Sequence, residues 1–134
     1  MDFIQATKSY FIKWNDFKSR NSRSEFWWGT LGINLISIIV GFTAGFVFYT
    51  VGLASDASID SIEATVNIIF TPWYIFTIIA GIALICRRLH DIDRSGWWYL
   101  IFFTVIGAFV LLYWFCKKGT DGKNRFGDNP LEEV

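Results

Sequence analysis

The sequence predicts an all-α integral membrane protein, with one amphipathic interfacial helix followed by three transmembrane helices. Of its 134 residues, 53% are hydrophobic and 19% aromatic, more apolar material than a small soluble domain can hide. Three runs contain no Asp, Glu, Lys, Arg or His, namely residues 26–53, 66–86 and 97–116. Each is long enough to cross a bilayer as a helix, and Trp, Tyr and Phe gather at its ends, as at membrane interfaces. We therefore expect residues 1–134 to form a single membrane domain.

Residues 1–18 are predicted to form a helix of a different kind. With 100° per residue, most of the apolar side chains fall on one face and the polar ones on the other. The apolar face consists of Ala6, Phe17, Tyr10, Phe3, Trp14, Phe11 and Ile4. This pattern favours an amphipathic helix in the plane of the lipid headgroups. The alternative is that the same face packs on the transmembrane helices.

The three apolar runs are predicted to be the transmembrane helices. The second helix should begin before its apolar part, because Asp60 followed by Glu63 has the spacing of a helix start. In the first run, Gly41 and Gly45 form a GxxxG pattern that permits close helix packing within the chain or in a homo-oligomer. After residue 116 the chain becomes glycine-rich and turn-prone, so residues 117–134 are predicted to be a polar tail.

The distribution of basic residues predicts the orientation but leaves one conflict. Residues 1–25 contain five Lys and Arg, residues 54–65 none and residues 87–94 three. Because basic loops favour the cytoplasm, we expect a multi-pass protein with a cytoplasmic N-terminus. Three spans then place the four basic residues of the tail outside. The alternative is that residues 97–116 form a re-entrant hairpin turning near Gly107, which returns the tail to the cytoplasm.

Residues 87–98 contain the best candidates for a binding site. Six ionisable residues lie within eight positions, namely Arg87, Arg88, His90, Asp91, Asp93 and Arg94. Arginine pairs with phosphate through two parallel hydrogen bonds, so the segment is either a specific anion site or a non-specific anchor in the headgroups. Arg20, Arg23 and Glu25 precede the first span and should lie on the same face, with Glu25 pairing with one of the arginines. Asn124 and Arg125 join this site only if the tail is cytoplasmic.

No pattern in the chain points to catalysis or to a cofactor. There is one histidine, His90, and the two cysteines, Cys86 and Cys116, lie far apart at the ends of apolar runs. We therefore predict no catalytic residues, no metal site, no cofactor and no nucleic-acid partner. A membrane enzyme using His90, Asp91 and Asp93 is the weakest interpretation. The spans contain no charged residue, so an ion pathway through them would lack its usual residues. Three helices are also too few to enclose a pore, so transport would require an oligomer.

Three separated strings resemble a known family. They are Arg20–Trp28 (RNSRSEFWW), Arg87–Asp91 continuing to Arg94–Trp98 (RRLHD…RSGWW), and Gly119–Gly122 continuing to Asn124–Gly127 and Pro130 (GTDG…NRFG…P). Their order and spacing resemble the bacterial membrane family catalogued as domain of unknown function 805. The chain departs from that family at Ser19, where glycine is usual, and at Thr104, where the last helix usually has proline. The resemblance implies a small bacterial inner-membrane protein and brings no activity with it.

Together these observations predict a non-catalytic module of the bacterial inner membrane. Its arginine-rich interfacial site would bind anionic lipid headgroups or an acidic segment of a partner. It would act as a homo-oligomer or as part of a larger membrane complex. The first alternative is a subunit of an oligomeric transporter or channel. A membrane enzyme is the second and less favoured alternative.

Overall fold

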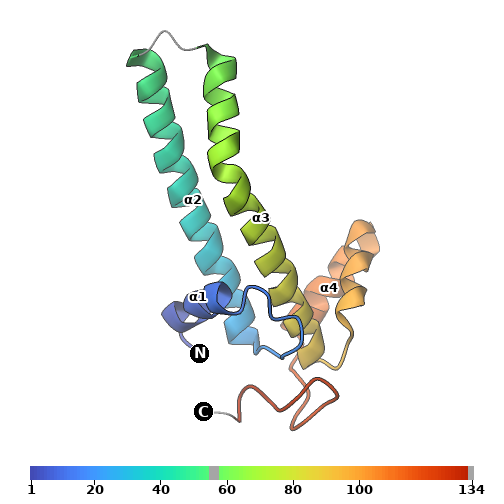
Figure 1. Ribbon diagram of the computed structural model, residues 1–134. Coiled ribbons are helices and arrows are strands. Elements are labelled where there is room, and N and C mark those ends of the chain that lie inside the picture. Colours follow the sequence, from blue (N-terminus) through green and yellow to red (C-terminus); the bar gives the residue numbers. More distant parts are fainter. Residues whose placement is uncertain (55–57, 133–134) are drawn as a thin grey trace.

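The computed structural model describes residues 1–54 and 58–132 and is helical, with no strand in this part of the chain. A short helix α1 (Phe3–Ile12) precedes two long antiparallel helices, α2 (Arg23–Ala54) and α3 (Ile59–Asp91). A 3₁₀ helix η1 (Gly96–Phe103) and helix α4 (Val105–Cys116) follow, and the tail lies below them (Figure 1). The connections between α1 and α2 and between α3 and η1 therefore lie at the same end of the molecule as the tail (Figure 1).

Helices α2 and α3 are long and apolar enough to cross a membrane. They contain 32 and 33 residues, so at 1.5 Å per residue each is roughly 50 Å long, more than the roughly 30 Å of hydrocarbon in a bilayer. Most of their apolar side chains remain exposed in the protein, as expected of surfaces that face lipid. Helix α3 begins before its apolar part, as predicted, but its first residue is Ile59 and its N-cap is Ser58.

The third apolar run does not form the predicted transmembrane helix. Residues 97–116 are divided at Thr104, whose backbone is extended (φ −109°, ψ 142°) and whose hydroxyl accepts a hydrogen bond from the Gly107 amide at 3.0 Å. The chain therefore turns back, and η1 and α4 form a hairpin beside α3 (Figure 1). Its arms, of 8 and 12 residues, span roughly 16 and 18 Å, too short to cross the hydrocarbon. The chain thus forms the hairpin of the alternative interpretation, with its turn at Thr104 rather than near Gly107.

Helix α1 lies across the lower end of α2 and is shorter than predicted, because it ends at Ile12 rather than at residue 18 (Figure 1). Asp2 and Gln5 form a reciprocal capping box at its start. Part of its apolar face packs on the long helices, and the Tyr10 hydroxyl donates to the Thr77 carbonyl of α3 at 2.9 Å. Close approach depends on Gly32 of α2, where a Cβ atom would lie 2.1 Å from the Thr7 hydroxyl oxygen.

One apolar cluster joins the helices at the lower end of the molecule. Its buried members come from α1, α2 and α3, and partly buried aromatic and aliphatic side chains surround them. The buried members are Tyr10, Phe26, Ile33, Ala80 and Leu84, and Phe11, Trp73, Phe76, Ile85 and Phe115 pack against them. Phe115 brings α4 into this cluster, so the hairpin is anchored where the charged segments of the chain also meet.

The hairpin turn should not tolerate a side chain at Gly107. A Cβ atom there would lie 1.9 Å from the Ile101 carbonyl oxygen, so the Gly107→Ala variant must displace backbone. We expect a loss of about 1–3 kcal/mol in the free energy of unfolding in detergent. The control is Gly41→Ala in α2, where nothing lies within 4 Å of the added carbon. Equal stability of the two variants would contradict the turn described above.

Candidate functional site

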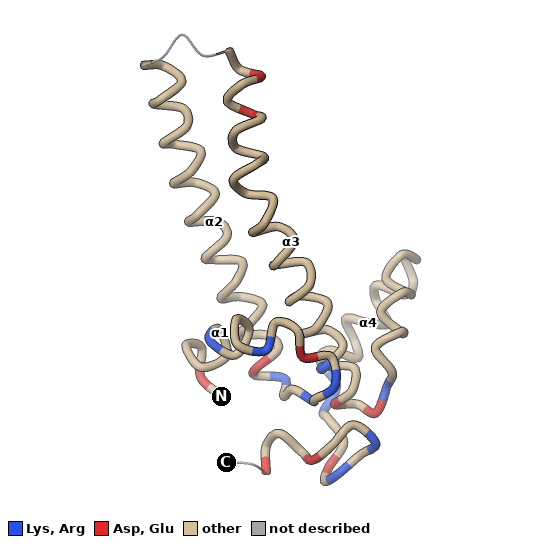
Figure 2. The backbone as a smooth tube through the Cα atoms, viewed as in Figure 1, with Lys and Arg blue, Asp and Glu red and all other residues tan. Residues whose placement is uncertain are grey.

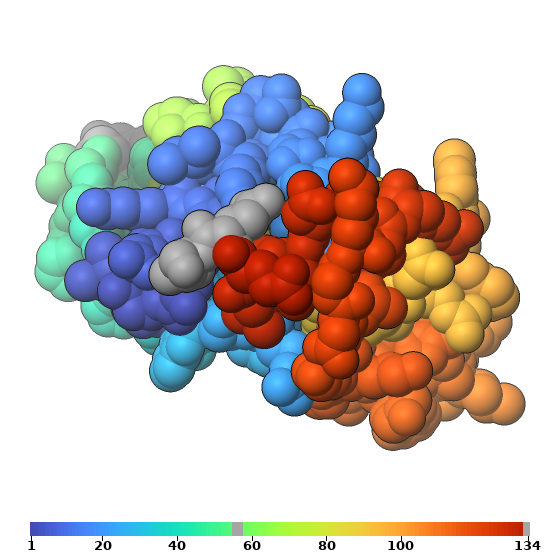
Figure 3. Space-filling model, turned by 90° about the horizontal axis from the view of Figure 1, so that it is seen from below, coloured from blue at the N-terminus to red at the C-terminus, as the bar shows by residue number. Residues whose placement is uncertain are grey.

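All twelve Lys and Arg lie at the end of the molecule where α1, the C-terminus of α3 and the tail meet (Figure 2). At the opposite end the described residues include only two charged ones, Asp60 and Glu63. Seen from below, the tail crosses this charged end between the N-terminal segment and the hairpin (Figure 3). Five charged side chains are buried beneath it. We call them the arginine cluster, which consists of Arg20, Glu25, Arg87, Arg88 and Asp91.

Asp91, the last residue of α3, links two of these arginines. One of its carboxylate oxygens accepts from Arg20 Nη2 at 3.1 Å and Nε at 3.3 Å. The other accepts from Arg88 Nη1 one turn earlier on α3. The side chains of all three are at most 5% exposed. Asp91 therefore fixes the segment before α2 to the end of α3 through two charge-assisted hydrogen-bonded pairs.

Glu25, in the first turn of α2, links the remaining helices. Its carboxylate accepts from the Ser9 hydroxyl of α1 at 2.6 Å and lies 3.5 Å from both Arg87 Nη1 and Lys13 Nζ. The predicted pairing of Glu25 with an arginine of residues 87–94 is thus confirmed for Arg87. Arg87 and Asp91 lie one turn apart on α3 but bind different partners, Glu25 for Arg87 and both Arg20 and Arg88 for Asp91.

The tail docks on the cluster mainly through its backbone. The Arg20 guanidinium donates to the carbonyls of Gly122 (2.8 Å), Gly127 (3.1 Å) and Thr120 (2.8 Å). The Thr120 amide in turn donates to the Asp91 carbonyl at 2.8 Å. Gly122 and Gly127 have φ of 66° and 123°, a backbone conformation that favours glycine. The glycines of the tail therefore allow the chain to bend around one guanidinium group.

Arg88 and His90 complete the docking of the tail. Arg88 donates to the carbonyls of Phe115 (3.1 Å) and Lys117 at the end of α4. The His90 ring stacks on Phe126 with 3.8 Å between centroids and 3° between planes. Burial lowers the pKa of His90, although the carbonyls of Ser19 and Lys18 favour the protonated ring. Burial and the Arg125 guanidinium together therefore favour the neutral ring by lowering its pKa.

Asn124 of the tail belongs to this arrangement, because its side-chain amide donates to the His90 carbonyl at 2.9 Å. The other predicted site residues lie outside the cluster. Arg125 forms an exposed ion pair with Asp93 at 3.1 Å. Arg94 lies over the rings of Trp98 and Trp114, 5.6 and 4.8 Å from their centroids. Arg23 is exposed, and its guanidinium lies 3.5 Å from the Cys116 carbonyl.

Several residues of the site could not be identified from the sequence. Ser9, Thr120 and Phe126 are common polar or aromatic residues, and each acquires its role only by contact with a distant segment. Arg87 has a further property that only the structure reveals. Its side chain is fully buried, yet Nη1 and Nη2 have no hydrogen-bond partner among the described residues.

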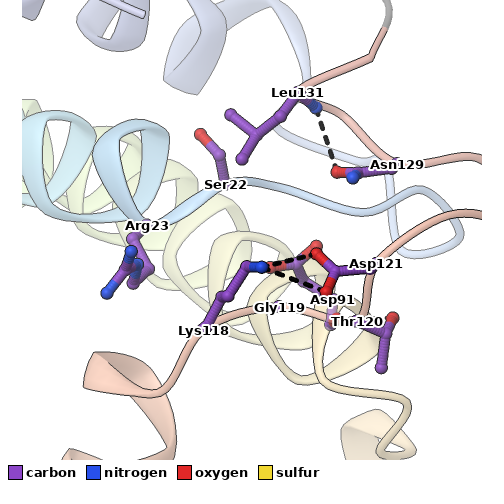
Figure 4. A pocket seen from close by; sticks show the side chains of 9 residues that line it. All are labelled: Ser22, Arg23, Asp91, Lys118, Gly119, Thr120, Asp121, Asn129 and Leu131. Atoms are coloured by element: carbon purple, nitrogen blue, oxygen red, sulfur yellow. Dashed lines mark hydrogen bonds and ion pairs between the residues drawn. The ribbon is translucent and has the colours of Figure 1, made fainter.

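A small cavity of about 60 Å³ lies between the cluster and the tail. Figure 4 shows the side chains of Arg23, Asp91 and Lys118 around it, with Lys118 paired to Asp121 at 2.7 Å. This volume is enough for only a few water molecules. Nor do the described residues contain a group of three or more His, Cys, Asp or Glu that could hold a metal ion. The cluster's arginines instead bind carboxylates and backbone carbonyls of the chain itself.

Two long apolar helices, an apolar hairpin and a charged end tied by buried arginines are the features of a small helical membrane protein. A family model described as "Protein of unknown function (DUF805)" matches residues 14–128, and the chain belongs to this family. It is 37% identical to the inner membrane protein YhaI of Escherichia coli K12 over 129 residues, covering 96% of the chain and 93% of the relative. It is 33% identical to the inner membrane protein YhaH of the same organism over 134 residues, covering 98% and 97%. No solved structure matches.

These relatives confirm the resemblance drawn from the three strings and place the family in the bacterial inner membrane. The family model covers all of the first two strings and all of the third except Pro130. Those strings contain every member of the arginine cluster. They also contain Gly122 and Gly127, whose carbonyls accept hydrogen bonds from Arg20. The residues that identify the family are thus the residues that tie its segments together.

Replacing Asp91 should destabilise the fold strongly. The Asp91→Asn variant leaves Arg20 and Arg88 buried without a countercharge, so we expect a loss of about 3–5 kcal/mol in the free energy of unfolding. The matched control is Asp93→Asn, which removes an ion pair whose side chains are 59% and 47% exposed and should cost at most about 1 kcal/mol. Denaturant titration in detergent measures both. Similar losses in the two variants would contradict a structural role for Asp91.

Proposed function

We propose that the protein is a non-catalytic module of the bacterial inner membrane that binds anionic lipid headgroups at its cytoplasmic surface. The observation that carries the proposal is that some basic residues are bound within the chain whereas others are exposed and unpaired. The arginines of the cluster are buried and bound to the chain itself. Five other basic residues are exposed and form no ion pair with any described residue. These five, the free cations, are Lys8, Lys18, Arg23, Arg94 and Lys117.

The same distribution of charge supports a cytoplasmic N-terminus and a cytoplasmic tail. Basic residues near the ends of spans favour the cytoplasm, and all twelve lie at one end of the molecule (Figure 2). With three spans, the tail and its four basic residues would lie outside. The re-entrant hairpin removes that conflict, because two spans return the chain to the side on which it began.

The free cations replace the buried arginines as the residues we expect to bind headgroups. Arg87 and Arg88 are fully enclosed by protein atoms, so a phosphate group reaches neither unless the tail leaves. A basic side chain near an anionic membrane surface contributes about 1 kcal/mol of binding. Several together therefore give a clear preference for phosphatidylglycerol or cardiolipin over zwitterionic lipid.

Lipid retention by the purified protein tests this proposal. The variant Lys8→Gln/Arg23→Gln/Lys117→Gln removes three free cations. The matched control is Lys118→Gln/Lys123→Gln/Arg125→Gln, which removes three exposed cations that already pair with carboxylates. Both variants lose the same charge, so a comparison of the two isolates the effect of the free cations.

We expect the first variant to lose roughly a hundredfold in phosphatidylglycerol affinity, about 1 kcal/mol for each cation, and the control to lose much less. Equal retention by both variants and the wild type would contradict headgroup binding. If the free cations instead bind an acidic peptide from a co-purifying protein and not lipid, the surface belongs to a protein partner.

A further inference from the structure

The tail covers the arginine cluster but is itself loosely packed. Residues 117–132 lie over the charged end of the molecule (Figure 3), yet Asn129 alone is buried among them. The side chain of Leu131 is 62% exposed, so the stacking of Phe126 on His90 is the main apolar contact of the tail. A segment with few buried apolar contacts opens locally at a low cost in free energy. The tail is therefore held mainly by hydrogen bonds.

Space remains on both sides of the tail. The cavity of about 60 Å³ described above lies between the tail and Asp91. A second cavity of about 460 Å³ lies between the tail and the N-terminal segment, where Lys13, Arg20 and Glu25 line it. The tail is thus not closely packed around Arg20, the residue that holds it through three of its carbonyls.

The acceptors that the tail and the end of α4 offer to the arginines are all neutral. Arg20 donates to three carbonyls and to the Thr120 hydroxyl at 3.1 Å. Arg88 donates to two carbonyls at the C-terminal end of α4. A phosphate group binds a guanidinium group more strongly than a carbonyl does, because it is charged and accepts two parallel hydrogen bonds. An anion can therefore compete with the tail for these donors.

The region beneath the tail contains more cations than carboxylates. Two carboxylates line the cavities from outside the tail, and the cations there line the cavities or pair with them. These carboxylates are Glu25 and Asp91, and the cations are Lys13, Arg20, Arg23, Arg87 and Arg88. Asp16, which accepts from the Ser19 amide at 3.1 Å beside the larger cavity, is a third carboxylate. Positive charge is still in excess, which favours an anion.

The charges of the tail do not remove this excess. Lys118 pairs with Asp121 at 2.7 Å, and Lys123 lies 3.5 Å from Asp128. The tail therefore satisfies hydrogen-bond donors of the cluster without neutralising its charge.

We propose that the tail is a displaceable cover and that a phosphate group takes its place on Arg20 and Arg88. Asp91 lies outside the tail, so it stays bound to both guanidinium groups when the tail leaves. The phosphate oxygens then accept the hydrogen bonds that the tail carbonyls accepted before. The inference rests on the proposed headgroup binding and deepens it, because it adds a covered site to the exposed free cations. An anionic lipid headgroup and free phosphate share this chemistry, and the experiment separates them.

Hydrogen exchange of single amides tests whether an anion displaces the tail. The Thr120 amide reports on the tail, because it donates to the Asp91 carbonyl at 2.8 Å. The Lys13 amide, which donates to the Ser9 carbonyl at 2.9 Å, is the control at the same end of the molecule. Both are measured by NMR at equal pH and ionic strength in three samples. These are phosphatidylcholine nanodiscs, the same nanodiscs with inorganic phosphate, and phosphatidylglycerol nanodiscs.

Relative to the Lys13 amide, the Thr120 amide should exchange at least about tenfold faster with the anion than in phosphatidylcholine alone. Acceleration by phosphatidylglycerol alone assigns the site to a lipid headgroup, and acceleration by inorganic phosphate assigns it to free phosphate. Unchanged or slower exchange of the Thr120 amide in both anionic samples would overturn the proposal.

The Gly119→Ala variant tests the cover in the opposite direction, because it displaces the tail without changing any charge. A Cβ atom at Gly119 would lie 2.1 Å from Asp91 Oδ2, and this carboxylate is fixed by two buried arginines, so the tail must move. We expect the affinity for the anion that accelerates exchange to rise about tenfold, because binding no longer has to open the tail. The matched control is Gly41→Ala, where nothing lies within 4 Å of the added carbon.

If Gly119→Ala fails to fold, Thr120→Ala weakens the cover more gently. It removes the hydroxyl that accepts from Arg20 and donates to the Asp91 carbonyl, so it should raise the same affinity by a smaller factor. An affinity that stays at the wild-type value, or falls, in the folded variant would contradict a covered anion site.

The two proposals can fail separately in these experiments. If Lys8→Gln/Arg23→Gln/Lys117→Gln loses phosphatidylglycerol affinity while the Thr120 amide of the wild type exchanges equally in all samples, the covered site is wrong and headgroup binding at the surface stands. If the triple variant keeps its affinity while the anion still accelerates exchange of the Thr120 amide, the surface proposal is wrong and the covered site stands.

Discussion

One carboxylate between two buried guanidinium groups determines the arrangement of the rest of the chain. Asp91 accepts from Arg20 and Arg88, and Arg20 also holds the tail through three of its carbonyls. Charges buried in this way are stabilising only when every partner is in place. Because the partners come from the segment before α2, the end of α3 and the tail, these three segments must lie together. The cluster is therefore a constraint on topology as much as a source of stability.

That constraint explains the hairpin. A third long helix would carry Lys117 and the tail to the opposite end of the molecule, away from Arg20 and Asp91. The turn at Thr104 keeps them at the same end, and Arg88 holds the end of α4 through the Phe115 and Lys117 carbonyls. The hairpin contacts the long helices mainly near its base, which leaves a cavity of about 550 Å³ between α3 and η1.

Much of the fold could be predicted from the sequence because hydrophobic length and charge act locally. The apolar runs at 26–53 and 66–86 lie within α2 and α3, and the charged segments at 20–25 and 87–94 meet at one end, as predicted (Figure 2). The hairpin could not be predicted, because an uncharged apolar run has the same composition whether it forms one long helix or two short arms that turn back. Thr104 breaks the helix through one hydroxyl–amide hydrogen bond, and threonine occurs in many unbroken helices. The burial of Arg87 and Arg88 could not be predicted either, because it depends on contacts with Glu25 and Phe115, which are distant in sequence.

The side of the membrane on which the tail lies tests this account most directly. In a background with Cys86→Ser and Cys116→Ser, the Asp60→Cys and Lys123→Cys variants each carry one reactive thiol at opposite ends of the molecule. A membrane-impermeant maleimide should label the Asp60→Cys variant in intact spheroplasts, and the Lys123→Cys variant only after the membrane is permeabilised. Labelling of both variants in intact spheroplasts would contradict a tail bound to the arginine cluster.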